Sequence, residues 1–290
     1  MIAFNIPFFS IFIMMFGAII TPLLPLKKRL PEKLLCWLIA IIGIFSAYLI
    51  FELSYPVLQP GFNYPVGHYP APWGNELRAG LLEAILSFVF CVAMLLSVLG
   101  NFSSTQEDIT PKRRQIFCVL ANLLMASLLA LTYTNDIFTA YVFIEINTIA
   151  ACAIVAVKES PETIRAALRY MIMSLVGSGL VLISICLLYG LTGHLLMQNM
   201  HNSILELVKT NRYILPLTVS LALVTVGLGI KSALYPFALW LPDAHASSTN
   251  ASSAILSGLV LKGHIFLIIK IFVRVFGLNV IKLLGMDTVI

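Results

Sequence analysis

Residues 227–245 read GLGIKSALYPFALWLPDAH and place a lysine and a proline inside an otherwise apolar, helix-like segment. Lys231 follows the apolar run directly, and Pro236 comes five residues later. Proline lacks a backbone N–H and breaks the hydrogen-bond ladder of a helix. The segment therefore either ends at Pro236 and Pro242, or it is a broken helix that lines a wet cavity around Lys231. Considered alone, it leaves both interpretations open.

The composition of the whole chain is that of a protein embedded in lipid. Of its 290 residues, 60% are hydrophobic and only 11% are charged, whereas a soluble domain carries roughly 25% charged residues. The sequence therefore predicts an integral membrane protein built of helices. The net charge of +5 belongs to basic residues between the apolar runs. We interpret these residues as membrane-topology signals and expect no nucleic-acid partner.

The apolar runs number eight, and each has about the 20 residues that a membrane-spanning helix needs. The predicted fold is an all-α polytopic membrane protein with about eight transmembrane helices, one of them broken around Pro236. The helical period at residues 204–208 predicts a further helix lying flat at the interface. The eight predicted spans cover residues 4–24, 34–53, 79–100, 116–134, 136–157, 164–189, 214–235 and 252–276.

Basic residues are distributed unevenly among the connections. The second, fourth and sixth connections hold only Arg78, Lys209 and Arg212. Because cytoplasmic loops are enriched in lysine and arginine, we expect the odd connections in the cytoplasm and the N-terminus outside the cell membrane. The first, third and fifth connections hold Lys27, Lys28, Arg29, Lys33, Lys112, Arg113, Arg114, Lys158, Arg165 and Arg169.

Ionisable side chains inside apolar spans are costly and are therefore functional candidates. Each has a plain alternative: Lys262 could snorkel to the interface, Glu145 could be a purely structural partner, and His264 could be a packed, hydrogen-bonded histidine. Glu52 and Glu83 lie near span ends, where we expect water to reach them. The candidate residues are Glu145, Lys231, Lys262, His245 and His264, with Pro236 as the helix break.

A lysine and a glutamate together in lipid can act as a proton switch. Desolvation disfavours the charged form of a lysine, and a nearby carboxylate favours it again. Moving that carboxylate or changing its charge therefore changes the proton affinity of the lysine. Such a switch needs no cofactor.

The cysteines give no sign of a metal or redox centre. All five lie singly inside apolar runs, which is typical of packing residues rather than of a disulfide framework or metal site. The chain also lacks a nucleotide-binding loop and a haem signature. We therefore predict no metal and no cofactor in this chain. The cysteines are Cys36, Cys91, Cys118, Cys152 and Cys186.

Several stretches resemble the antiporter-like subunits shared by respiratory complex I, Mrp-type cation/proton antiporters and membrane-bound energy-converting hydrogenases. The run ALYPFALWLPDAHASSTNASSAILSGLVLKG (233–263) resembles the stretch that joins the broken seventh helix of that family to the eighth. TNDIFTAYVFIE (134–145) and the run 169–193 are similar to its fifth and sixth helices. GHYPAPWGNELR (67–78) is similar to an external loop and favours the Mrp and hydrogenase branch. Many relatives have Ala-Pro-Thr-Pro where this chain has residues 248–251, Ser-Thr-Asn-Ala.

The resemblance implies roles for the candidate residues. Glu145 and Lys231 would form the pair that sets proton affinity, and Pro236 would open the helix to water. Lys262 would receive the proton, with His245 and His264 as auxiliary relays.

The resemblance also implies a half fold. Residues 1–115 would form an N-terminal three-helix region, residues 116–276 the first of two inverted five-helix repeats, and residues 277–290 a tail. We expect another polypeptide to supply the second repeat. Any redox chemistry would belong to partner subunits such as a peripheral iron–sulfur or hydrogenase arm.

The function predicted from the sequence is H⁺ or Na⁺ translocation by a non-catalytic membrane subunit of a redox-driven complex, a membrane-bound hydrogenase or a relative of complex I. Two alternatives are a subunit of a stand-alone Mrp-type Na⁺/H⁺ antiporter and a purely structural subunit of a membrane arm.

Overall fold

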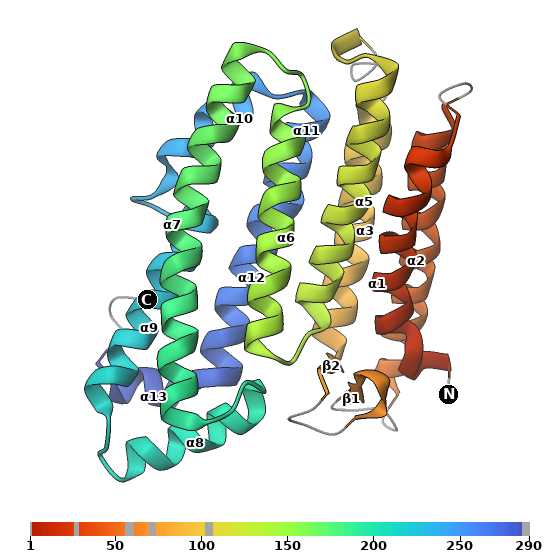
Figure 1. Ribbon diagram of the computed structural model, residues 1–290. Coiled ribbons are helices and arrows are strands. Elements are labelled where there is room, and N and C mark those ends of the chain that lie inside the picture. The colour runs from red at the N-terminus through yellow and green to blue at the C-terminus, as the bar shows by residue number, and fades with distance from the viewer. Residues whose placement is uncertain (1, 26–28, 56–60, 70–73, 102–106, 286–290) are drawn as a thin grey trace.

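The computed structural model describes residues 2–25, 29–55, 61–69, 74–101 and 107–285 as a bundle of long helices with one small β-hairpin (Figure 1). Within these residues, eight helices are long and apolar enough to cross a membrane. This confirms the predicted all-α polytopic fold. The uninterrupted spans are α1 (Ile2–Ile20), α2 (Leu30–Ser54), α3 (Leu81–Gly100), α5 (Pro111–Tyr133), α6 (Ile137–Ala156), α7 (Pro161–Thr192) and α9 (Ile214–Lys231).

The eighth span is a composite of four helical segments that run on from one another between Asn250 and Phe276. Two of them are π-helical turns, which occur mostly as single turns and frequently at functional sites. A short helix, α13 (Leu278–Leu283), follows the span. The four segments are α11 (Asn250–Ile255), η5 (Leu256–Val260), α12 (Leu261–Ile271) and η6 (Phe272–Phe276).

One end of the bundle, here called the hairpin end, carries the strands β1 (Phe62–Pro65) and β2 (Glu76–Ala79), which pair antiparallel. A 3₁₀ turn, η3 (Val66–His68), follows β1. The amphipathic helix α8 (Met197–Lys209) lies across the same end, as expected for an interfacial helix (Figure 1).

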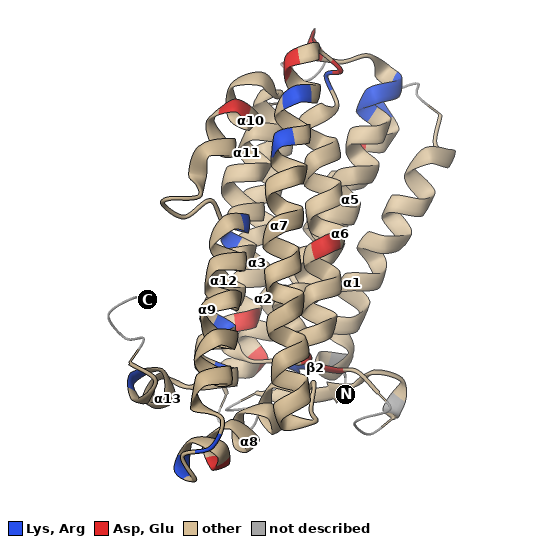
Figure 2. Cartoon of the chain, turned by 60° about the vertical axis from the view of Figure 1, so that its left-hand side comes forward, with Lys and Arg blue, Asp and Glu red and all other residues tan. Residues whose placement is uncertain are grey.

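The opposite end, here called the α10 end, carries the short helix α10 (Leu241–Ser247) and the first turns of α5 and α7 (Figure 1). In Figure 2, several of the ribbon segments coloured for lysine and arginine lie at this end. This placement agrees with the uneven loop charges, although the assignment of the two ends to the two sides of a membrane stays a prediction. Lys27 and Lys28, residues 70–73 of the loop compared above, and residues 286–290 lie outside the described part of the chain.

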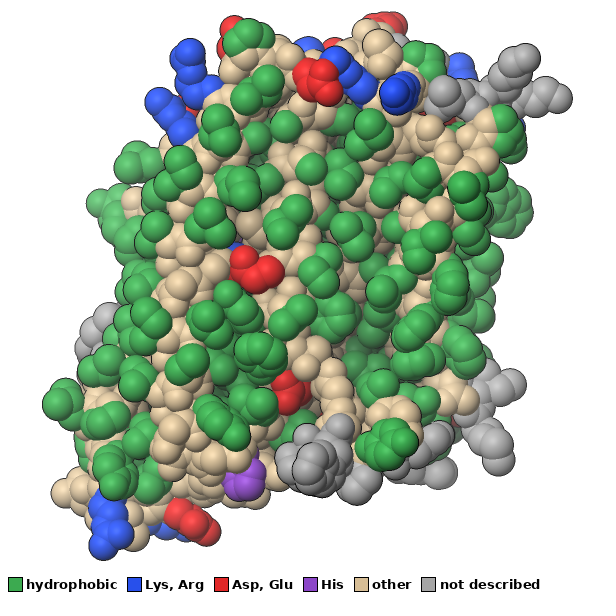
Figure 3. All heavy atoms as spheres, in the orientation of Figure 1, with side chains coloured by type: hydrophobic (Ala, Val, Ile, Leu, Met, Phe, Trp, Pro, Cys, Tyr) green, Lys and Arg blue, Asp and Glu red, His purple; other side chains and the backbone are tan. Residues whose placement is uncertain are grey.

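The surface between the two ends is apolar. On α7, for example, Ile172, Leu175 and Val176 are each more than half exposed. Figure 3 shows that hydrophobic side chains cover most of the face seen in Figure 1. Water does not solvate an apolar surface of this extent, so this surface faces lipid or other membrane helices.

The fourth span, α5, lies between the first three spans and the rest of the bundle. Its Gln115 side chain donates to the carbonyls of Thr21, Pro22 and Leu24 at the end of the first span. The division of the chain near residue 115 into a three-helix region and a five-helix repeat stays a prediction.

Candidate functional site

The helix α9 ends inside the bundle, at Lys231. Ala233 takes a left-handed conformation (φ 52°), the N–H of Leu234 donates to the Gly229 carbonyl (2.9 Å) and the N–H of Ala233 donates to the Ile230 carbonyl (3.2 Å). These two bonds form a Schellman motif, which satisfies carbonyls that the end of a helix leaves free. The motif therefore pairs two of the carbonyls that an interruption at membrane depth would otherwise leave free.

The interruption extends from Ser232 to Phe237 and contains the predicted helix break, Pro236. Helical structure resumes with a 3₁₀ turn, η4 (Ala238–Trp240), and continues into α10. The ring of Trp240 stacks on Tyr170 of α7 with centroids 4.1 Å apart, and its Nε1 donates to the Ile230 carbonyl (3.2 Å). The seventh span is thus a broken helix, as predicted, but its first half stops five residues before the proline.

Lys231 and Glu145, both predicted from the sequence, are in direct contact. Lys231 Nζ lies 3.1 Å from Glu145 Oε1 and donates to Thr148 Oγ1 at 3.0 Å. Ser178 Oγ of α7 donates to the same carboxylate oxygen at 2.5 Å. Glu145 and Thr148 are three residues apart on α6 and so share one face of that helix.

The two partners differ in accessibility. The Lys231 side chain is fully buried, whereas 24% of the Glu145 side chain is exposed. A buried ammonium without a partner is strongly unfavourable, so the carboxylate largely determines whether Lys231 holds its charge. Because part of the Glu145 side chain is exposed, a lipid or a protein next to the bundle can contact its carboxylate.

Two glycines bring α7 and α9 together beside this pair. A Cβ atom on Gly177 would lie 2.7 Å from the Gly227 carbonyl oxygen and 3.3 Å from Lys231 Cγ, and one on Gly227 would lie 2.6 Å from the Gly177 carbonyl oxygen. Only glycine allows this close approach. The contact fixes the last turn of α9, and with it the backbone of Lys231, against α7.

His264 is fully buried beside the end of α9. Its Nδ1 lies 3.0 Å from the Lys231 carbonyl oxygen. Because a carbonyl only accepts, Nδ1 carries the hydrogen, and in the neutral ring Nε2 is the acceptor. Nε2 is buried and has no hydrogen-bond partner among the described residues. His264 therefore contacts the backbone of Lys231 rather than its ammonium.

Lys262 lies on the opposite side of α12 from His264. It is exposed, and within the described residues it makes no hydrogen bond or ion pair. Residues two apart on a helix do not share a face. The structure thus brings Glu145, Lys231 and His264 together and leaves Lys262 on the surface of the span, immediately after η5.

His245 lies on α10, in the second half of the broken helix. Its Nδ1 is 2.6 Å from Ser253 Oγ, and it does not contact Lys231. Nearby, the Thr249 side chain accepts from the N–H of Ser252 (3.1 Å), and Ser252 Oγ donates to the Ile154 carbonyl (3.0 Å). Hydroxyl groups thus fix the segment in which many relatives have prolines.

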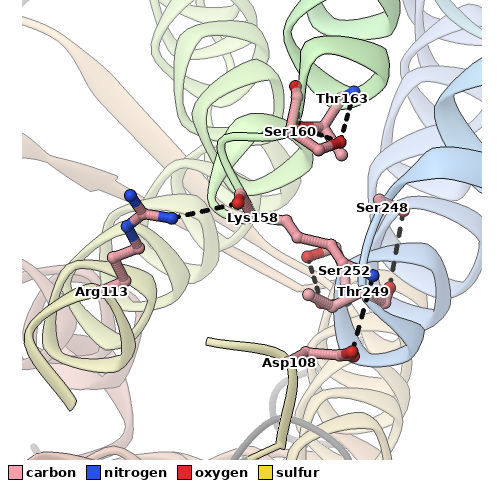
Figure 4. A network of polar contacts seen from close by, with 8 residues as sticks. All are labelled: Asp108, Arg113, Lys158, Ser160, Thr163, Ser248, Thr249 and Ser252. Atoms are coloured by element: carbon pink, nitrogen blue, oxygen red, sulfur yellow. Dashed lines mark hydrogen bonds and ion pairs between the residues drawn. The ribbon is translucent and has the colours of Figure 1, made fainter. Parts of the chain in front are cut away.

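A wider network of polar contacts surrounds this segment at the α10 end (Figure 4). Arg113 of α5 donates to the Lys158 carbonyl (3.0 Å), and Lys158 Nζ lies 3.6 Å from Asp108. These contacts join the first turn of α5 to the connection between α6 and α7. They leave the buried Glu145–Lys231 pair untouched.

Further charged side chains lie buried at the hairpin end. The sequence-based expectation was wrong for Glu83 and did not include Lys270. Glu83 was expected to meet water, but its side chain is only 1% exposed and forms an ion pair with Arg274. The expectation was wrong because Arg274 of the eighth span reaches the buried Glu83 carboxylate, a tertiary contact that the position in a predicted span does not disclose. Lys270, 3% exposed, was not a candidate. Its position inside the predicted span 252–276 is the signal that the sequence offers for it.

The interrupted seventh helix and the buried lysine–carboxylate pair define a polytopic membrane protein of the antiporter-like class. A family profile described as "NADH:quinone oxidoreductase/Mrp antiporter, TM" matches residues 134–285. The chain belongs to this family. The matched range holds all six residues predicted as site residues.

Individual relatives and structures agree with the family. NADH-quinone oxidoreductase subunit N of Desulforudis audaxviator is 33% identical over 205 residues, which cover 69% of this chain and 39% of that protein. A probable K⁺/H⁺ antiporter subunit of Rhizobium meliloti is 28% identical over 246 residues, 81% of this chain and 44% of that protein. The chain thus spans less than half the length of these two curated relatives.

Among solved structures, a chain of the membrane-bound sulfane sulfur reductase, an archaeal respiratory membrane complex, superimposes with a TM-score of 0.79 at 23% identity. The match covers 99% of this chain and 56% of that chain. It shows that the two chains share a fold.

Proposed function

We propose that this chain is an H⁺- or Na⁺-translocating membrane subunit of a redox-driven complex, a relative of membrane-bound hydrogenases or of complex I. The observation that carries the proposal is the contact of 3.1 Å between the fully buried Lys231 ammonium and the Glu145 carboxylate, at the point where α9 is interrupted. A redox-driven assembly is supported by a relative that is named as part of NADH-quinone oxidoreductase and by the fold shared with an archaeal respiratory complex.

In this proposal the Glu145–Lys231 pair operates as a charge switch. With Glu145 ionised and in contact, Lys231 keeps its proton. When Glu145 turns away or accepts a proton, the buried ammonium loses its compensating charge and releases its proton. Thr148 and Ser178 hold the two charged groups by hydroxyl contacts that can exchange partners.

Lys262 is the proposed next station, with His264 and His245 as auxiliary relays. The unpaired Nε2 of His264 provides a buried acceptor on the side of α12 that faces Lys231. Lys262 is exposed on a span, where a lone ammonium against lipid is unfavourable. Its exposure therefore supports a neighbouring membrane subunit on this side, which we propose supplies a second antiporter-like repeat.

The proposed orientation follows the basic residues. The α10 end faces the cytoplasm, and the hairpin end, with the first residues of α1, faces the outside of the cell membrane. The electron-transfer reactions belong to other subunits, such as an iron–sulfur or hydrogenase arm.

A second candidate function is that of a subunit of a stand-alone Mrp-type antiporter. It is favoured by the relative that is named as a probable K⁺/H⁺ antiporter subunit. The two functions differ in their energy source. Cation/proton exchange by the complex in liposomes without any electron donor would support the antiporter, whereas ion movement that depends on a donor would support the redox-driven complex.

Substitution of Glu145 by glutamine tests the switch. Glu145→Gln keeps the size of the side chain but removes the charge, and we expect coupled ion movement to fall roughly tenfold or more while complex assembly is retained. The measurement is ion uptake by membrane vesicles that hold the native complex. The matched control is Glu52→Gln on α2, a carboxylate that contacts Tyr48 and not Lys231. Unchanged ion movement in Glu145→Gln would exclude the charge switch.

A further inference from the structure

The last two turns of the eighth span carry two cations that the proposed relay does not use. Lys270 lies on α12, six residues after His264, which corresponds to a rise of about 9 Å along a helix. Arg274 follows one turn later, in η6. The eighth span ends toward the hairpin end (Figure 1), where Lys270 contacts carbonyls at the end of α5 and Arg274 pairs with Glu83 at the start of α3.

The Lys270 ammonium is held by backbone carbonyls rather than by a carboxylate. Nζ donates to the Thr132 carbonyl at 2.8 Å, to the Leu131 carbonyl at 3.5 Å and, in a shorter contact, to the Thr134 carbonyl. These are the carbonyls that the end of α5 leaves free. The C-terminal end of a helix attracts a positive charge. The ammonium is thus fixed by dipoles that do not titrate.

The carboxylate that contacts one of these two cations, that of Glu83, already has partners. Glu83 pairs with Arg274 and accepts from the N–H of Gly80 (3.1 Å). Glu83 and Arg274 therefore balance each other as an ion pair, and the Lys270 ammonium adds a positive charge whose hydrogen-bond acceptors are backbone carbonyls.

We propose that Lys270 is a fixed positive barrier that keeps protons and metal cations entering from the hairpin end away from Lys231. A buried positive charge repels other cations strongly because the surrounding dielectric constant is low. The stretch between Lys270 and His264 is packed with buried apolar side chains, among them Leu131 and Leu267. Apolar packing and charge together would close this end, so that an ion leaving Lys231 has to move sideways through Lys262.

This inference rests on the proposed function, because a barrier matters only if Lys231 exchanges ions. The alternative roles of Lys270 are a relay and a purely structural cap of α5. The three roles differ in whether they survive replacement of Lys270 by arginine. Arginine keeps the charge and the donors but does not release a proton, so it preserves a barrier or a cap and abolishes a relay.

The test is passive proton conductance, measured without any substrate. Membrane vesicles that hold the full chain in its native complex are given a pH gradient, and its decay is followed with a pH-sensitive dye. We expect Lys270→Gln, which keeps amide donors for the carbonyls but loses the charge, to speed the decay roughly tenfold. Lys270→Arg and the control Lys282→Gln, an exposed lysine of α13, should match the parent.

Two results would overturn the barrier. One is a Lys270→Gln complex that accumulates normally and leaks no faster than the parent; the other is a Lys270→Arg complex that leaks as fast as Lys270→Gln. If Lys270→Gln is lost from the membrane, Lys270→Met, which fills the volume of the lysine stem, takes its place. Loss of both variants beside a normal Lys270→Arg would show a structural cap and contradict the barrier.

The leak assay does not depend on ion pumping, so the two proposals can fail separately. Unchanged pumping in Glu145→Gln with a leak in Lys270→Gln would remove the charge switch and keep the barrier.

Discussion

Among the residues that the structure describes, two lysines are buried within the spans, and they are held in different ways. Lys231 contacts a single carboxylate and a hydroxyl, at a place where its helix stops. Lys270 lies in a span that continues past it, and backbone carbonyls hold its ammonium. A carboxylate can gain a proton or turn away, whereas the end of a helix keeps its dipole. The comparison teaches that the partner of a buried lysine, rather than its burial, indicates whether its charge can change.

The largest expected effect separates the two lysines directly. Lys231→Met should reduce ion translocation by ~100-fold or more, since proton transfer through a positioned group contributes about that factor. Lys231→Arg should be equally inactive, because arginine keeps its proton, whereas Lys270→Arg should remain active. The measurement is coupled ion uptake by vesicles, normalised to the amount of assembled complex.

Lys282→Met, outside the spans, serves as the control for a lost lysine. An active Lys231→Arg complex would show that Lys231 needs only its charge. The contrast between the two lysines would then disappear.

The sequence predicted the first of these lysines and missed the second for physical reasons. Glu145 lies in the middle of one long apolar run and Lys231 in the late part of another predicted span, so the cost of a charge in lipid marks them without any knowledge of packing. The prediction that they form a pair came from the family resemblance and not from their spacing in the sequence. Glu83 and Lys270 lie near the ends of spans, where depth alone does not distinguish water from protein. Only the packing of the eighth span against α3 and α5 buries them.

The eight spans were predictable because hydrophobic length is a local property of the chain. The residue at which α9 ends was less predictable from the sequence. Pro236 marks the interruption, but the helix stops at Lys231 because Ala233 takes a left-handed conformation and closes a Schellman motif. A residue other than glycine at that position gives no signal in the sequence.

A smaller effect concerns how firmly the Lys231 region is held. Gly177→Ala would place a Cβ atom 2.7 Å from the Gly227 carbonyl oxygen and should lower the free energy of unfolding by about 1–3 kcal/mol. Gly179→Ala, on the same helix, is a matched control because its Cβ meets no atom within 4 Å.

Thermal unfolding of the two glycine variants in detergent checks this prediction. Equal stability would show that α7 and α9 can separate. The Lys231 backbone would then not be fixed, and the contrast with its changeable charge would be lost.

The smallest expected effect concerns the second half of the broken helix. Trp240→Phe removes the indole donor to the Ile230 carbonyl, but that carbonyl keeps the N–H of Ala233. The loss should therefore be about 1 kcal/mol of stability, with a several-fold slower rate at most. The control is Trp37→Phe, because Trp37 is 69% exposed on α2. A complete loss of activity in Trp240→Phe would instead place the tryptophan within the ion path.

The contact between Gly177 and Gly227 has a mechanical consequence. Because α9 is fixed to α7 within one turn of Lys231, the base of that side chain is held and only its four-carbon stem is free to swing. Rotation about single side-chain bonds takes picoseconds to nanoseconds, whereas helix displacements take microseconds or longer. A charge carrier of this kind requires no rocking of helices between two positions. The rate at which Lys231 moves its charge would be set by how often the electric field at Glu145 changes. That rate would therefore depend on the neighbouring group that produces the field.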